Sequence, residues 1–176
     1  MIRSTSRAIA TVALLVTLTS AAYADDGCDG FKWDVARERA VFAGNAEPLT
    51  AGRDAGSGGE LRAERLYDIW LAPQSQVDLS VPLGNKTRVG NVVAGFAHVR
   101  IADAGRYRIS LDQAAWIDVV GAQGVIASSD FAGQRGCSAP HKVVQFELPA
   151  GSVLLQVTGA AGVHLQVAVT RVPSAP

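Results

Sequence analysis

Few residues of this sequence have side chains suited to catalysis or metal binding. The chain of 176 residues contains three histidines, His98, His141 and His164. A non-haem iron site needs two histidines and a carboxylate around one metal. No two of these histidines form an H-x-H or H-x3-H pair, so we predict a non-catalytic protein without a metal or other cofactor. The alternative is a metal-dependent, dioxygenase-like enzyme on a cupin-like barrel, in which all three histidines converge from separate strands.

The two cysteines, Cys28 and Cys137, are predicted to form a disulfide. Metal sites usually present closely spaced ligands, such as C-x2-C or H-x3-H, and only Cys137 and His141 come near that spacing. An exported chain with two cysteines favours one intramolecular bridge. This bridge would tie the N-terminal segment to the start of a strand.

Two tryptophans and an aspartate are the candidate ligand-binding residues. Trp70 and Trp116 fall in the opposite phase to the aliphatic residues of their strands, and Asp118 shares the face of Trp116. An aromatic ring beside a carboxylate on an open sheet face suits a sugar, through apolar stacking and acceptance of hydrogen bonds from hydroxyls. The alternative is that both faces of these strands are covered and that the tryptophans pack in the core against the N-terminal helix.

Residues 1–24 have the pattern of a signal peptide. Arg3 and Arg7 precede an apolar stretch from Ala8 to Leu18, and Ala22 and Ala24 provide a small-x-small cleavage site. The apolar stretch is shorter than the roughly 20 residues that a membrane-spanning helix needs. We therefore expect a periplasmic or secreted protein, residues 25–176, without a membrane span after cleavage.

Charge argues against a nucleic-acid partner. The chain has 16 basic and 16 acidic residues, and loss of the two arginines of the signal peptide leaves 14 basic residues. These charges are scattered, whereas nucleic-acid binding needs a basic patch. The expected partner is an envelope protein or a glycan.

Hydrophobic periodicity predicts an all-β domain. Residues 25–45 contain the one good helix candidate, with Asp34 as its N-terminal cap. The Gly-rich and charged residues 46–65 are predicted to be a loop. About eight or nine short segments with period two follow, separated by turn residues, which is typical of an antiparallel, jelly-roll-like β-sandwich.

Two of these segments carry specific predictions. Residues 77–81, VDLSV, are predicted to be a strand that ends before Pro82. Residues 141–148 are predicted to pair with 152–158 as a hairpin closed at Pro149-Ala150-Gly151. Val144, Phe146 and Leu148 would then face the core. Lys142 has the same phase, and we expect its long apolar stem to carry the ammonium out to solvent.

Two stretches, AGRYRISLDQAAWIDVVGAQGVIASS and CSAPHKVVQFELPAGSVLLQVTGA, resemble the bacterial pre-peptidase C-terminal type of β-sandwich. The positions that match are Gly105, Tyr107, Trp116, Asp118, Val119, Gly124, Lys142, Val144, Phe146, Leu148 and Gly151. The chain also resembles small exported proteobacterial proteins of unknown role. The first resemblance implies a non-catalytic accessory or binding module. Such modules usually belong to a larger enzyme, whereas here the module has its own N-terminal helix.

Taken together, these features favour an exported binding or accessory module of the cell envelope that binds a carbohydrate or a protein. One alternative is the metal-dependent enzyme that uses the three histidines. Another is a structural envelope protein that pairs with its partner through an exposed sheet edge.

Overall fold

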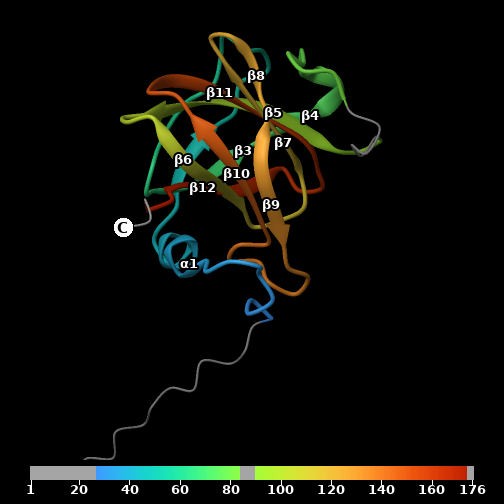
Figure 1. The fold of residues 1–176 in the computed structure, drawn as a ribbon. Coiled ribbons are helices and arrows are strands. Elements are labelled where there is room, and N and C mark those ends of the chain that lie inside the picture. The colour runs from blue at the N-terminus through green and yellow to red at the C-terminus, as the bar shows by residue number, and fades with distance from the viewer. Residues whose placement is uncertain (1–26, 84–89, 174–176) are drawn as a thin grey trace, which may run out of the picture.

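The protein is a sandwich of two β-sheets, as the periodicity predicts (Figure 1). The computed structural model describes residues 27–83 and 90–173, so the predicted signal peptide lies outside the described residues. One sheet, here called sheet A, has the order β1 (Glu47–Thr50), β3 (Leu66–Trp70), β12 (His164–Arg171), β6 (Gly105–Leu111), β10 (Lys142–Leu148) and β9 (Ser128–Gly133). Sheet B has the order β2 (Glu60–Arg62), β5 (Val93–Ile101), β11 (Gly151–Ala160), β7 (Trp116–Gly121) and β8 (Gly124–Ile126), with β4 (Ala72–Pro73) beside β5.

The core lies between the two sheets and uses the faces that alternation predicts. From β6 it takes Tyr107, Ile109 and Leu111, and from β10 it takes Val144, Phe146 and Leu148. Phe146 is only 1% exposed. The inner residues of β5 and β11 pack against them from sheet B. Burial of these aliphatic and aromatic side chains is the main source of folding stability.

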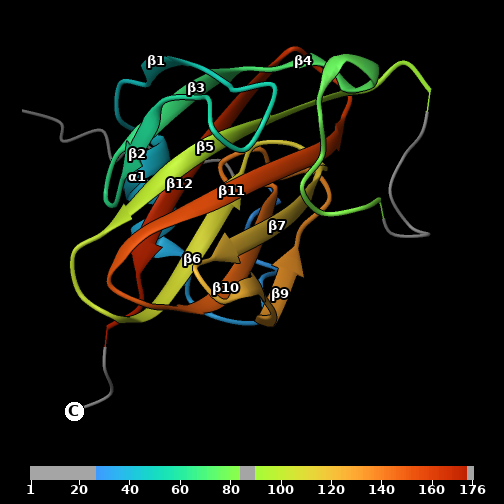
Figure 2. The same cartoon turned by 90° about the horizontal axis from the view of Figure 1, so that it is seen from above.

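The long strands alternate between the sheets, and this makes the predicted hairpin wrong. β10 pairs with β6 and β9 in sheet A, whereas β11 pairs with β5 and β7 in sheet B. The turn at Pro149-Ala150-Gly151 therefore carries the chain from one sheet to the other, and Figure 2 shows the strands of the two layers crossing. Period two reports which side of a strand is buried, but it does not report which strand lies next to it.

Residues 46–65, predicted to be a loop, contain the short strands β1 and β2. Both lie at sheet edges and pair in parallel, β1 with β3 and β2 with β5. Alternation is weak in both strands. β1 has no buried residue, and β2 has three residues, of which only Leu61 is buried. With these and other short pieces, the described residues hold twelve strands rather than eight or nine.

The predicted strand at residues 77–81 does not form. A short 3-10 helix, η1 (Gln74–Gln76), precedes an irregular segment that lies over the outer face of sheet B. The side chain of Gln156, fully buried on β11, binds the backbone of Val81 twice. Its oxygen accepts from the Val81 amide at 3.0 Å, and its nitrogen donates to the Val81 carbonyl at 2.9 Å. These bonds satisfy the backbone polar groups of Val81 without a strand ladder.

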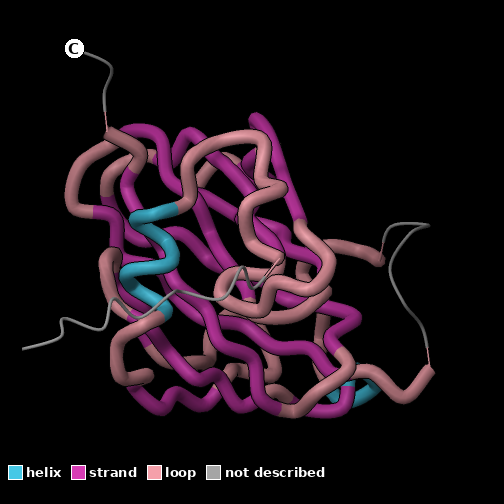
Figure 3. The backbone as a smooth tube through the Cα atoms, turned by 90° about the horizontal axis from the view of Figure 1, so that it is seen from below, coloured by secondary structure: helices cyan, strands magenta, loops and turns pink. Residues whose placement is uncertain are grey.

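The N-terminal segment covers part of the outer face of sheet A. Its helix, α1 (Ala36–Phe42), lies over the strands when the molecule is seen from below (Figure 3). The Asp34 carboxylate accepts from the Ala36 amide at 2.8 Å, although by backbone conformation the N-cap is Val35. On the helix, the buried Glu38 accepts from the Thr170 hydroxyl at 2.7 Å. This bond attaches α1 to β12.

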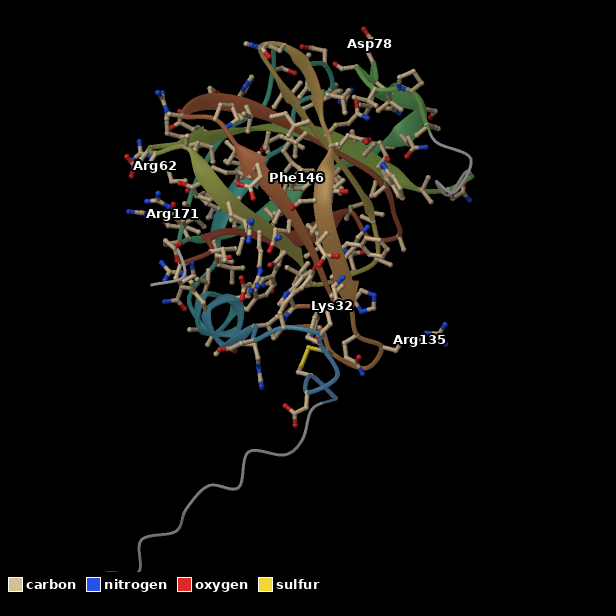
Figure 4. All side chains as sticks on the ribbon, viewed as in Figure 1. Lys32, Arg62, Asp78, Arg135, Phe146 and Arg171 are labelled. Carbon is tan, nitrogen blue, oxygen red and sulfur yellow. A yellow bond between two sulfur atoms is a disulfide. The ribbon has the colours of Figure 1, made fainter. Side chains whose placement is uncertain are left out.

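The predicted disulfide between Cys28 and Cys137 is present, and it closes a separation of 109 residues. Figure 4 shows it in yellow below the sandwich, next to the N-terminal segment that carries Lys32. Such a bridge is compatible with a protein that folds outside the cytoplasm. Neither helix of the described residues has the length and apolar character needed to cross a membrane.

Candidate ligand-binding pocket beside Trp116

Both candidate tryptophans are exposed, and they belong to different sheets. Trp70, on β3 of sheet A, is 53% exposed, and Trp116, on β7 of sheet B, is 41% exposed. The alternative in which both pack in the core against the helix is therefore wrong. Each ring has its own set of neighbours, so the two are described separately.

Trp116 borders a cavity of about 410 Å³ at the side of the sandwich. The lining residues come from one strand of sheet B and two strands of sheet A. They are Trp116 and Ile117 from β7, Ser128 and Phe131 from β9, and Lys142 and Val144 from β10. We call this cavity the Trp116 pocket.

The Trp116 pocket opens directly onto the hydrophobic core. Ile117 and Val144 belong to the core cluster and are 7% and 6% exposed, so they form an apolar floor. Phe131 pairs with Val144 across the β9–β10 ladder, yet it is 68% exposed. An exposed aromatic ring above an apolar floor suits an apolar ligand group.

Lys142 supplies a positive charge to this apolar pocket. Its side chain follows the inward phase of Val144 and Phe146, as predicted, but the ammonium does not extend freely into solvent. It donates a hydrogen bond to the Ala115 carbonyl at 2.6 Å and lies 5.4 Å from the centre of the Trp116 ring. Burial lowers the pKa of the Lys142 ammonium from its ordinary value, and the Asp118 carboxylate opposes that shift.

Asp118 holds the Trp116 ring in place. One carboxylate oxygen accepts from the indole nitrogen of Trp116 at 3.0 Å, and the other accepts from the Gln156 amide at 3.3 Å. Burial raises the pKa of Asp118, and these two hydrogen bonds and the charge of Lys142 oppose the shift. These two bonds fix the carboxylate beside the indole, so Asp118 positions the Trp116 ring.

Trp70 forms a second candidate site, on the outer face of sheet A. Its ring meets that of His164 edge-on, with 4.1 Å between the ring centroids. The Asp68 carboxylate lies 3.1 Å from Nδ1 of His164. An indole, an imidazole and a carboxylate thus lie side by side on an open sheet surface.

The three histidines do not form one site. His98 is on β5 of sheet B, His164 is on β12 of sheet A, and His141 lies just before β10, where Nδ1 is 3.1 Å from the Cys137 carbonyl. Within residues 27–83 and 90–173, no group of three or more His, Cys, Asp or Glu side chains is arranged to hold a metal ion. The enzyme alternative therefore lacks the convergence of histidines that it requires.

The free edge of β9 is partly blocked. The Phe131 amide donates to the Asp130 carboxylate at 2.9 Å, and Lys32 from the N-terminal segment binds the same carboxylate. An amide engaged in this way cannot pair with an added strand, and charged side chains are a common protection of sheet edges. This edge thus gives little support to the structural, edge-pairing alternative.

The chain matches no protein-family model, and no curated protein matches it at a significant level. The resemblance to the pre-peptidase C-terminal type of sandwich therefore stays a prediction.

Sequence reasoning found Trp116 and Asp118 but missed the pocket between the sheets. Phe131 is the clearest omission, because it follows the polar residues Ser128, Ser129 and Asp130 and belongs to no alternating pattern. An isolated aromatic residue in a polar stretch was the signal available. The pocket also depends on Lys142, whose side chain was expected to reach solvent.

Proposed function

We propose that this protein is an exported, non-catalytic binding module that holds a small organic ligand in the Trp116 pocket. The main support is one observation: two exposed aromatic rings, Trp116 and Phe131, flank an apolar floor that belongs to the core. Ligand sites are typically concave and mostly apolar, with a few placed polar groups that orient the ligand. The disulfide and the signal-like residues 1–24 support a periplasmic or secreted location.

Binding can be tested through the indole N–H resonances of the ¹⁵N-labelled mature protein. The chain has three tryptophans, Trp33, Trp70 and Trp116, so each resonance can be assigned with a Trp→Phe variant. We expect the neutral aromatic probe phenylacetamide to shift the Trp116 resonance with increasing concentration and to leave that of Trp70 in place.

The matched control compares Trp116→Ala with Trp70→Ala. Both substitutions remove an exposed indole, but only Trp116→Ala should abolish the binding of phenylacetamide, which ligand-observed NMR follows in either variant. If phenylacetamide binds equally well to both variants, or if neither it nor its anionic counterpart phenylacetate shifts an indole resonance, the Trp116 pocket is not the ligand site.

A second candidate function is glycan binding at Trp70. It is favoured by the exposed indole beside Asp68 and His164 on an open sheet face. Sugars stack on such rings while carboxylate and imidazole groups bind their hydroxyls. Titration with cellobiose should shift the Trp70 resonance if this candidate holds, and the Trp70→Ala variant should then lose the response.

A further inference from the structure

Lys142 is unusual among the cations of this protein. Most arginine and lysine side chains of the described residues form ion pairs, as Arg108 does with Glu38 and Arg106 with Glu147. Lys142 has no ion-pair partner among those residues, although it is partly buried. Its ammonium donates a hydrogen bond to a neutral carbonyl, that of Ala115. A partly buried ammonium without a direct ion pair costs free energy, and such groups are concentrated at functional sites.

The surroundings of this ammonium leave room for an anion inside the pocket. An ammonium has three donor hydrogens, and the Ala115 carbonyl accepts from one of them. Asp118 is the carboxylate whose charge acts on Lys142, and its two oxygens are bound to Trp116 and Gln156. From β9, the pocket receives Ser128 and Phe131, which carry no charge. The contacts of Lys142 within the described residues therefore leave hydrogen-bonding capacity for a ligand.

Resting on the function proposed above, we propose that the ligand of the Trp116 pocket is a small amphipathic carboxylate. Its aromatic or aliphatic body lies between Trp116 and Phe131, over the floor of Ile117 and Val144. Its carboxylate accepts hydrogen bonds from the Lys142 ammonium. This arrangement gives each lining group a partner of matching chemistry: apolar surface for the rings and the floor, and an anion for the cation.

A comparison of matched probes tests the charge preference. Phenylacetate and phenylacetamide share the aromatic body and differ in the anionic group, while acetate has the anionic group without the body. Because hydrogen bonds to charged groups are stronger than neutral ones, phenylacetate should bind about tenfold more tightly than phenylacetamide. Acetate should bind more weakly than phenylacetate, because it cannot use the apolar floor. Dissociation constants follow from titration of the Trp116 indole resonance.

The variant Lys142→Met keeps a long apolar side chain and removes the charge. In this variant the preference for phenylacetate should disappear, so that the ratio of the two dissociation constants falls to about one whatever the absolute affinity for phenylacetamide. A phenylacetamide-dependent shift of the Trp116 resonance also reports that the variant has kept its pocket. Lys32→Met is the matched control, because its ammonium lies 5.7 Å from the Phe131 ring but is paired with Asp130. This control should keep the preference.

The outcomes separate the two proposals. If neither phenylacetate nor phenylacetamide shifts the Trp116 resonance, the binding function itself is wrong. If both bind equally, or if Lys142→Met keeps the preference for phenylacetate, the pocket binds ligands but its carboxylate specificity is refuted.

Discussion

Removal of the disulfide tests how the N-terminal segment contributes to the fold. We consider the double variant Cys28→Ala/Cys137→Ala. Alanine is preferred to serine because both cysteines are only 2% exposed, so a serine hydroxyl would be buried without a partner. The variant removes the covalent link and leaves the contacts of the segment with sheet A in place.

The expected loss follows from the length of chain that the bridge closes. Cys28 and Cys137 are 109 residues apart, and for a loop of that length the chain-entropy relation gives about 5 kcal/mol. The disulfide contributes this full stabilisation if residues 27–43 unfold together with the sandwich. Contacts that couple them include Arg108, which donates to the Asp34 carbonyl at 2.8 Å and lies 4.8 Å from the Trp33 ring. We therefore expect the variant to lose about 3–5 kcal/mol of unfolding free energy.

Urea unfolding monitored by circular dichroism measures this loss. Reductant should lower the stability of the wild type by a similar amount and leave that of the double variant unchanged. If the variant lies within about 1 kcal/mol of the wild type, the N-terminal segment does not unfold with the sandwich. If both cysteines are alkylated in native, unreduced protein, the bridge itself is absent.

Two further predictions concern the core and a partly buried carboxyl group. Phe146→Ala should cost about 3–5 kcal/mol, because Phe146 is 1% exposed in the core, whereas Gln145→Ala, on the outer face of the same strand, should cost less than about 1 kcal/mol. Denaturant unfolding checks both values, and the reverse order would mean that the faces of β10 are wrongly assigned. Burial raises the pKa of Asp112, so its ionised carboxylate lowers the stability of the fold at neutral pH. This cost decreases as the pH falls through the folded-state pKa and is gone below the unfolded-state pKa. Asp112→Asn keeps an oxygen that can accept from the Gln166 amide, so the variant should be at least as stable as the wild type at pH 7. Its gain in unfolding free energy should shrink in acid. A variant that is less stable than the wild type at pH 7 would contradict this reasoning.

The buried faces of the strands could be predicted from the sequence because they depend on local alternation. Phe146 is in the core and Trp116 is exposed, each as its phase indicates. The neighbours of a strand depend on the packing of the whole chain, and here the predicted hairpin fails. The inner residues of β10 and β11 bury their apolar surface face to face across the sandwich instead of side by side in one sheet.

The site could be predicted only in part for the same reason. Trp116 and Asp118 are two residues apart on one strand, so their proximity is local. Phe131 and Lys142 reach the Trp116 pocket from β9 and β10 of the opposite sheet. Their proximity to Trp116 results from the packing of one sheet on the other, so no spacing in the sequence predicts it.

The most direct test of the proposed function is the location of a bound aromatic probe. In the complex of residues 25–176 with phenylacetamide, intermolecular nuclear Overhauser effects identify which methyl groups lie near the aromatic protons of the probe. The proposed function predicts contacts with the methyl groups of Ile117 and Val144, the floor of the Trp116 pocket. Contacts with the surroundings of Trp70 and His164 instead, or contacts with no part of the Trp116 pocket, would contradict it.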